Sequence, residues 1–395
     1  NLSAGYGLLY PGLLRKDSGE LHQTVENSWY TELMCEAYQN RKRTEVGLSK
    51  KQSDDISNPI FLNCIDINYI HCINKLLNAQ YYLEECPDQD LIVLVPAILE
   101  WMVPDSVDGT WVIDLSLEEG RGWYDHIAEI IHSEIDSFDT CSLSIGFPFP
   151  HPEDYNITEF TSVETFPIDE WEDRLDSPTI TFIWRGADSS ARRLWSSWIH
   201  SGGLRRKARG YLNLLDNKFG EPTLALREQR KNIIETANFL RKTVPNLNCG
   251  VAGVGTSYEF PDWIADIRFD APTKAEERQL CERYAKSHVV VGAHGSHLAL
   301  PSAHAGATVQ VINAAKRDNM LTDLILHPAG QKETLFRYRV LPAVVSNKIV
   351  AHEVVSVLLY GRRLQSQVER QWRGHNLSIE DVDDTRQAQR ELFED

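Results

Sequence analysis

The chain has 395 residues, of which 42% are hydrophobic and 25% are charged, and its formal net charge is -17. This composition is typical of a globular protein, and the length predicts about two domains that each bury a core without help from disulfides. The strong negative charge disfavours non-specific binding to nucleic acids and to anionic membranes.

The cysteines and the start of the sequence bear on where the protein works. The seven cysteines are scattered without a C-x-x-C pair, and an odd number leaves at least one thiol unpaired in a monomer. This pattern favours a reducing compartment such as the cytoplasm over the lumen of the secretory pathway. No run of about 18 apolar residues is present. Because the sequence begins at Asn1 rather than Met, we expect membrane contact only through an anchor missing from that end.

The first 150 residues alternate between strand and helix patterns. Residues 58–85 predict a strand, a turn and a helix whose apolar positions recur near the helical period. The apolar run 91–95 suits a buried parallel strand, and residues 111–116 suit another. Residues 123–135 predict an amphipathic helix with isoleucines on one face. This alternation predicts an α/β fold.

A Pro-rich, acidic segment over residues 147–178 has weak periodicity, which is typical of a connection between domains. We therefore predict an N-terminal domain over residues 1–170 and a second domain over residues 171–350. A carboxyl-terminal helix and a charged tail are expected over residues 351–395.

The second half repeats the alternation of strands and helices. Thr273 and Glu276 have the spacing of a capping box, which predicts the start of a helix. The predicted strands are 179–186, 249–254, 288–292 and 308–313, and the predicted helices are 224–244, 274–287 and 296–304.

The stretch HVVVGAHGSHLALPSAHAGATVQVI (288–312) combines several histidines and glycines, some of them in a loop between a predicted strand and a short helix. Gly292 and Gly295 would let the backbone approach a ligand closely. The amides of Gly295, Ser296 and His297 would open the helix, where the dipole favours a phosphate. The imidazole of His294 could donate to the same oxygens. A tight turn with capping histidines, without chemistry, is the alternative.

A metal site is a further alternative for this stretch. His294, His297 and His304 could be imagined as three ligands of a zinc-dependent hydrolase. However, His294 and His297 flank a turn rather than one helix face, and the cluster holds neither an H-E-x-x-H motif nor a carboxylate. The sequence therefore disfavours a metal.

These residues resemble a known family. The stretch 288–312 is similar to the signature of family-61 glycosyltransferases, in which an apolar strand runs into G-x-H-G-A-x-L and then G-[AS]-x-V-[IV]-E. Residues 68–85 resemble that family's N-x-x-H-x-x-x-x-x-L-x-R-L element, with His71 as the histidine. The strand TFIWRG followed by Arg192 and Arg193 resembles its strand that ends in arginine. The family's acidic residue falls near Val311, where Gln310 and Asn313 are the nearest polar residues.

The resemblance implies the GT-B fold, with two Rossmann-like domains facing each other across a cleft. It also implies an inverting transferase that moves a hexosyl, pentosyl or N-acetylhexosaminyl group to a glycan or glycoconjugate hydroxyl. The donor is a nucleotide sugar, and neither a cofactor nor a metal is required. The same fold could instead serve a catalytically silent module that binds nucleotides or glycans.

Such an enzyme needs a phosphate site and a base. Without a metal, the departing nucleoside diphosphate must be neutralised by protein cations and amides. The resemblance implies that a general base takes the acceptor's proton, and we expect His71 ahead of Asp66 in that role. The residues expected to bind the donor are Arg185, Arg192, Gly292, His294, Gly295, Ser296, His297 and Asn313.

Overall fold

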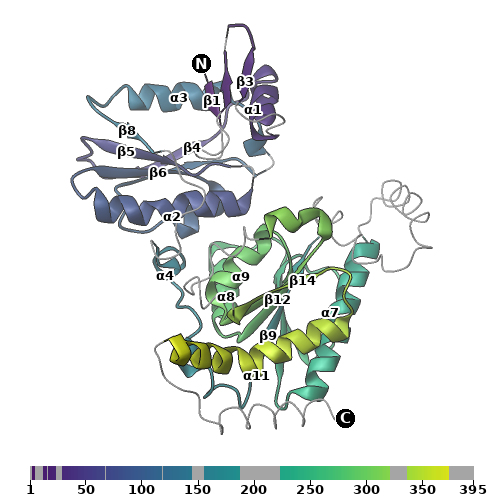
Figure 1. Cartoon of the computed structure of the whole chain (residues 1–395). Helices are drawn as coiled ribbons and strands as arrows, with labels where there is room; N and C mark the ends of the chain where they lie inside the picture. The colour runs from purple at the N-terminus through teal and green to yellow at the C-terminus, as the bar shows by residue number, and fades with distance from the viewer. Residues whose placement is uncertain are drawn as a thin grey trace. The chain divides into compact units, whose positions relative to one another are not determined.

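The computed structural model of the protein describes residues 2–4, 12–15, 17–23, 29–66, 68–117, 119–144, 155–186, 223–320 and 336–372. The chain forms two compact units, Asn1–Ser162 and Val163–Asp395, each of which contains its own mainly parallel sheet (Figure 1). The prediction of two Rossmann-like α/β units is therefore confirmed. None of the helices in the described ranges is long and apolar enough to cross a membrane.

The first unit is built on a five-stranded sheet in the order β4-β7-β6-β5-β8. The strands β5 to β8 are parallel, and β4 pairs antiparallel with β7 at one edge. The chain moves outward from β5 through β6 to β7 and then returns to the other side of β5 with β8. The strands are β4 (Leu48–Gln52), β5 (Pro59–Asn63), β6 (Asp90–Pro96), β7 (Gly109–Ile113) and β8 (Ser142–Leu143).

Helices and a small second sheet complete the first unit. Helix α2 packs against β5 and β6 with one apolar face, on which Ile73, Leu76 and Leu77 are almost wholly buried. The other helices are α1 (Trp29–Gln39), η1 (Ala97–Met102), η2 (Glu119–Arg121), α3 (Asp125–Ile135) and α4 (Ile157–Thr161); α2 is Tyr69–Glu85. A small antiparallel sheet holds β1 (Leu2–Ala4), β2 (Gly12–Leu14) and β3 (Leu21–Gln23).

The second unit has a six-stranded, wholly parallel sheet in the order β11-β10-β9-β12-β13-β14. Counted along the chain, this is the order 3-2-1-4-5-6 of the dinucleotide-binding Rossmann fold. The direction of winding reverses between β9 and β12. The strands are β9 (Thr179–Arg185), β10 (Asn248–Val254), β11 (Ile264–Phe269), β12 (Val289–Ala293), β13 (Ala307–Ile312) and β14 (Tyr338–Pro342).

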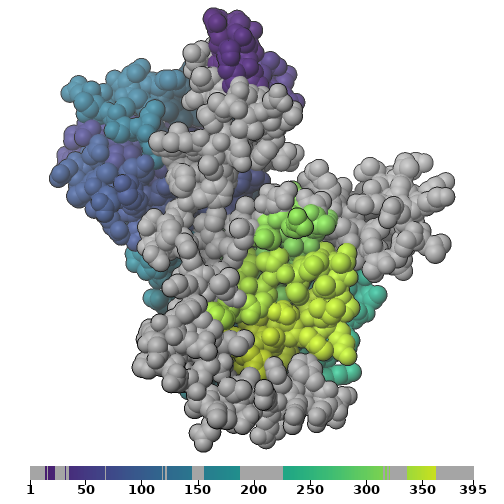
Figure 2. Space-filling model, viewed as in Figure 1, coloured from purple at the N-terminus to yellow at the C-terminus, as the bar shows by residue number. Residues whose placement is uncertain are grey.

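Helices cover both faces of this sheet, which explains why its strands are apolar on both sides. Along β9, Phe182 and Trp184 belong to the core cluster under α7 and α11, whereas Ile183 belongs to the cluster under α8 and α9. Helices α7 and α11 lie against each other, and α11 contributes to the molecular surface seen in Figure 2. The helices are η3 (Ile168–Glu170), α7 (Thr223–Thr243), α8 (Lys274–Ala285), η4 (Ser296–Leu298), α9 (Ala299–His304), η5 (Ala314–Asn319) and α11 (Asn347–Trp372).

The start of α8 follows the expected capping box. The Thr273 hydroxyl accepts from the Glu276 amide at 3.4 Å, and the Glu276 carboxylate accepts from the Thr273 amide at 2.8 Å. These two bonds satisfy backbone donors that a helix leaves unpaired at its first turn, so the predicted start of the helix is confirmed.

The segment between the two units packs more closely than its composition suggests. The units divide between Ser162 and Val163, within the connecting segment 147–178 predicted from the sequence. Phe166 and Trp171 are buried in the core of the second unit, and the Trp171 indole donates to the Leu358 carbonyl at 3.1 Å. Residues 163–178 therefore belong to the second unit and contribute to its core. Likewise, α11 packs on α7 and on the sheet of that unit.

Candidate functional site

The sheet of the second unit opens where its winding reverses. Strand β12 pairs with β9 only as far as Val291 and Phe182, although β9 continues to Arg185. On its other side, β9 stays paired with β10 through Arg185 and Val254. In open α/β sheets, ligands bind outside the carboxyl ends of the strands at this reversal. Arg185 ends one flanking strand, and the loop from His294 follows the other.

Gln229 of α7 hydrogen-bonds the backbone of Arg185 at the point where β12 no longer pairs with β9. The Gln229 side chain is fully buried. With its amide oriented to suit both partners, it donates to the Arg185 carbonyl at 3.0 Å and accepts from the Arg185 amide at 2.9 Å. The end of β9 therefore remains hydrogen-bonded although its neighbouring strand has moved away, because a buried backbone group left without a partner would be costly.

His294 is held by a residue on the next strand. The Gln310 amide nitrogen hydrogen-bonds Nδ1 of His294, and both side chains are buried. An amide nitrogen can only donate, so in this contact Nδ1 accepts and the ring N–H lies at Nε2. His294 is thus an N–H donor at Nε2. Gln310, which stands near the position of the family's acidic residue, sets this tautomer.

Gly295 brings the arginine and the histidine loop together. Its φ of 145° lies in a region that other residues rarely adopt. A Cβ atom at this position would stand 3.1 Å from Nη1 of Arg185 and 3.1 Å from the His297 ring. The guanidinium therefore lies directly against the loop. Burial, with Arg185 and His294 nearby, lowers the pKa of His297 well below its usual range, so this ring is neutral.

The remaining predicted donor residues have different surroundings. Gly292 is packed from inside the protein, because an added Cβ would stand 2.9 Å from Leu298 and 3.1 Å from Ile183. Its small size therefore serves the packing of η4 on the sheet. Ser296 begins η4, and Asn313 follows β13 at the same edge of the sheet. Arg192 and Arg193 lie outside the described residues.

The histidines do not form a metal cluster in the described part of the chain. Among those residues, no group of three or more His, Cys, Asp or Glu side chains is placed to hold an ion. His304, imagined as the third ligand, is fully buried, and its Nδ1 lies 3.0 Å from the Leu300 carbonyl in α9.

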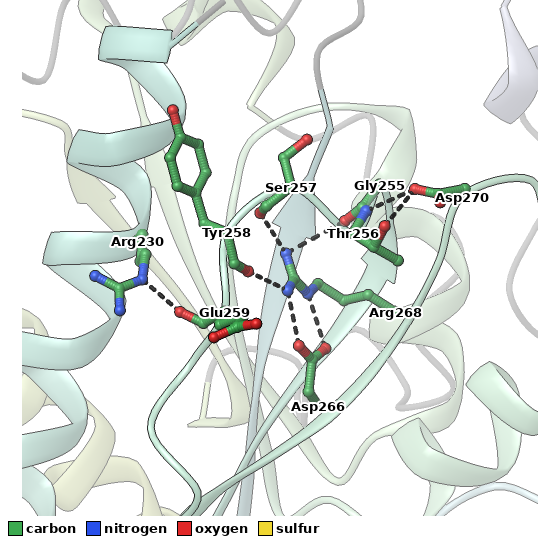
Figure 3. Close-up of polar contacts among 9 residues, drawn as sticks. All are labelled: Arg230, Gly255, Thr256, Ser257, Tyr258, Glu259, Asp266, Arg268 and Asp270. Atoms are coloured by element: carbon green, nitrogen blue, oxygen red, sulfur yellow. Dashed lines mark hydrogen bonds and ion pairs between the residues drawn. The ribbon is translucent and has the colours of Figure 1, made fainter.

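A second arginine near the same edge of the sheet is fully occupied. Arg268 of β11 donates from all five N–H groups to the carbonyls of Gly255, Ser257 and Tyr258 and to both oxygens of Asp266 (Figure 3). Its guanidinium also stacks on Trp184 and Phe260. Arg268 therefore holds the loop that follows β10 in place and has a structural role.

The first unit places the two candidate bases in contact. Asp66 and His71 follow β5, the strand at which the winding of that sheet reverses. His71 Nδ1 lies 3.0 Å from Oδ1 of Asp66, whose side chain has no exposed surface, whereas 15% of the His71 side chain is exposed. The carboxylate accepts the Nδ1 proton and leaves Nε2 as the basic nitrogen. This is how a carboxylate orients a catalytic histidine.

Helix α2 and its entry turn build this contact. The Asn68 amide donates to Oδ1 of Asp66 at 3.3 Å, and Lys75, one turn after His71, approaches Oδ2 at 2.9 Å. Sequence reasoning named His71 and Asp66 as separate candidates but missed their pairing and the part of Lys75. The spacing of four between His71 and Lys75 was the available signal, because such residues share a helix face.

Gln229, Gln310 and Arg268 were also missed as supporting residues. Each contacts a partner on a different element, and no local pattern marks a glutamine or an arginine for such a contact. Gln229 lies within a predicted helix and Gln310 within a predicted strand, so only their burial reveals them.

Comparisons with known proteins add little to this description. No protein-family model matches the sequence, and no curated protein matches it. A crystal structure of a putative UDP-N-acetylglucosamine 2-epimerase from Listeria monocytogenes is similar at 10% identity and a TM-score of 0.36, over 82% of this chain and 98% of that one. A likeness of this size says nothing about what this chain does, so the function is argued from its own residues.

Proposed function

We propose that the chain is an inverting glycosyltransferase that moves a sugar from a nucleotide-sugar donor to a hydroxyl of a glycan or glycoconjugate, without a metal ion. The observation that carries the proposal is the position of Arg185 and His294 on the two sides of the reversal between β9 and β12. A guanidinium beside an imidazole N–H suits a diphosphate, because charge-assisted hydrogen bonds to phosphate are strong.

The proposal assigns the donor to the second unit. When the bond between the anomeric carbon and the phosphate oxygen breaks, its electron pair leaves with the nucleoside diphosphate. Arg185 then balances the new charge, and Nε2–H of His294 donates to a phosphate oxygen. The backbone of Arg185 and the ring of His294 are held in place before the ligand arrives, which lowers the cost of reorganisation during the reaction.

The proposal assigns the acceptor's proton to the first unit. Nε2 of His71 removes the proton from the attacking hydroxyl, and Asp66 stabilises the imidazolium that forms. The acceptor oxygen bonds the anomeric carbon on the face opposite the departing phosphate, so the configuration inverts. The transferred group is a hexosyl, pentosyl or N-acetylhexosaminyl group.

The test begins with binding and then measures turnover. The purified chain is heated with a panel of nucleoside diphosphates and nucleotide sugars, and a ligand at 100 times its Kd should stabilise it by about 2.7 kcal/mol. With the donor that binds, release of nucleoside diphosphate is followed over a panel of glycan acceptors in excess chelator. Unchanged turnover in chelator supports the proposal. Absence of binding to every nucleotide, or loss of turnover that zinc restores, would contradict it.

A binding module without turnover is the second candidate. Gln310, the buried partner of His294, occupies the strand where the resemblance implies an acidic residue. This candidate predicts saturable nucleotide binding that depends on Arg185, with no nucleoside diphosphate released over any acceptor. The same two measurements therefore distinguish the candidates.

A further inference from the structure

Lys75 completes a polar cluster around Asp66 in the first unit. Its Nζ lies 2.9 Å from Oδ2 of Asp66 and 3.1 Å from the Ile65 carbonyl. Oδ1 of the same carboxylate faces Nδ1 of His71 at 3.0 Å. Oδ2 therefore faces Lys75, whereas Oδ1 faces His71 and also accepts from the Asn68 amide, and both side-chain partners come from one face of α2. Only 18% of the Lys75 side chain is exposed.

We propose that Lys75 is a positioning residue that sets the tautomer and the proton affinity of His71 through Asp66. This inference rests on the proposed function, in which His71 is the base. By binding Oδ2, the ammonium group fixes the rotation of the carboxylate and leaves Oδ1 for Nδ1–H of His71. The lone pair of Nε2 is then available to remove a proton.

The charge of Lys75 has a second consequence. A buried carboxylate without a counter-charge would draw a proton onto the neighbouring imidazole and hold it there, because an opposite charge favours the protonated ring. An imidazolium cannot act as a base. Lys75 offsets part of the Asp66 charge, so we expect its removal to strengthen the hold of Asp66 on that proton.

Among the described residues, the two neighbouring thiols and Glu119 supply no counter-charge to Asp66. The thiols of Cys64 and Cys72 are both buried. Burial, reinforced by the Asp66 charge, raises the pKa of Cys72 to about 12, and burial also raises the pKa of Cys64 well above its usual value. Both thiols are therefore neutral at physiological pH. Glu119, on the adjacent η2 turn, is engaged by Ser116 through both its hydroxyl and its amide.

A structural role alone would make different predictions. Because Lys75 also binds the Ile65 carbonyl, it joins the end of β5 to α2 and contributes to stability. If that were its whole function, its removal would lower the melting temperature without changing the pH at which His71 titrates. The decisive measurement is therefore the titration of the His71 ring.

The experiment uses the full chain with ¹⁵N-labelled histidine rings, whose NMR signals report both tautomer and protonation. Of the 13 histidines, His71 is assigned by the signal missing from His71→Asn. In the wild type we expect the Nδ1–H tautomer. In Lys75→Met the titration midpoint should rise by about one pH unit. Lys75→Arg, which keeps the cation, should restore it.

Lys50→Met is the matched control. Lys50 lies in the same unit and pairs with Glu134, away from His71 in the chain, so its removal should leave the His71 midpoint unchanged. An unchanged midpoint in Lys75→Met would overturn the proposal. If Lys75→Met does not fold, Lys75→Gln provides the same measurement, and an Nε2–H tautomer at His71 in the wild type would also overturn the proposal.

Turnover separates this inference from the proposed function. If His71 is the base, the pH profile of kcat should move upward in Lys75→Met together with the NMR midpoint. An NMR shift in a chain that transfers no sugar would sink the proposed function and leave the Lys75–His71 linkage standing. If turnover requires His71 but its pH profile is the same in Lys75→Met, the proposed function stands and the inference about Lys75 fails.

Discussion

Gln229 on α7 hydrogen-bonds both backbone groups of Arg185 at the end of β9, at 2.9 and 3.0 Å. A side chain thus supplies the backbone hydrogen bonds that a neighbouring strand supplies elsewhere in the sheet. Because the Gln229 amide takes the place of a strand partner, β12 can separate from β9 after Phe182 while the end of β9 stays hydrogen-bonded. The opening at the reversal of the sheet therefore depends on one buried amide.

Replacing Gln229 by Leu should weaken nucleotide binding and also lower stability. The change leaves a buried amide and a buried carbonyl of Arg185 without partners, at about 1–3 kcal/mol for each group. Calorimetric titration with a nucleoside diphosphate and denaturation by urea measure the two effects. Gln39→Leu, on the exposed side of α1, serves as control. Wild-type affinity in Gln229→Leu would show that Arg185 does not need this support.

Replacing His294 by Ala should lower nucleotide affinity and turnover together. The lost hydrogen bond to a charged group is worth about 1.5–3 kcal/mol, or roughly ten- to a hundredfold in Kd. His352→Ala, on an exposed position of α11, should change neither quantity. If donor affinity and rate survive in His294→Ala, the loop after β12 is structural.

Replacing His71 by Ala should lower kcat by about 10²–10⁴-fold, which is the usual contribution of a general base. Donor affinity should remain near that of the wild type, because Arg185 and His294 belong to the other unit. The comparison requires kcat, the nucleotide Kd and the melting temperature of the same preparation. A parallel fall in all three would indicate a structural histidine, and an effect below threefold would exclude His71 as the base.

Replacing Arg268 by Met should release the loop after β10. The change removes five hydrogen bonds and two stacking contacts, so the free energy of unfolding should fall by about 3 kcal/mol or more. Hydrogen exchange at residues 255–259 should accelerate. Arg230→Met is the matched control, because Arg230 donates one bond to the Glu259 carbonyl of the same loop, and its loss should cost about 1 kcal/mol (Figure 3).

Stability should fall as the solution becomes more acidic than about pH 6.5. Burial lowers the pKa of His288 and of His304 to about 4, so between these pH values the unfolded chain binds protons that the folded chain excludes. Each histidine then removes about 1.4 kcal/mol per pH unit from the free energy of unfolding. Urea denaturation from pH 7 to 5 measures the slope. It should be shallower in His288→Gln and unchanged in the exposed-site control His352→Gln.

Local pattern was enough to predict the inner strands and the main helices. The apolar runs at β6 and β12 suited buried strands, and the capping box before α8 predicted the start of that helix. The edge strands β4, β11 and β14 were not predicted. Their residues are largely exposed or only partly buried, so the periodic signal is weak.

The candidate site was predictable in position but not in construction. Arg185 and His294 were found because each follows an apolar strand, and the ends of strands gather at one edge of a parallel sheet. Their supports Gln229 and Gln310 depend on contacts between distant parts of the chain, which no local spacing encodes. The burial of Phe166 and Trp171 likewise depends on distant contacts, because their segment has the composition of a linker although both rings lie in the core.

The bond from Trp171 to the Leu358 carbonyl joins positions 187 residues apart. A ribosome delivers Trp171 long before α11, so the second unit cannot complete its core until Leu358 has emerged. The first unit, which ends at Ser162, is by then free to fold. A message that is cut short before α11 would yield a folded first unit joined to an aggregation-prone remnant. The second unit therefore completes its core only after α11 has been synthesised.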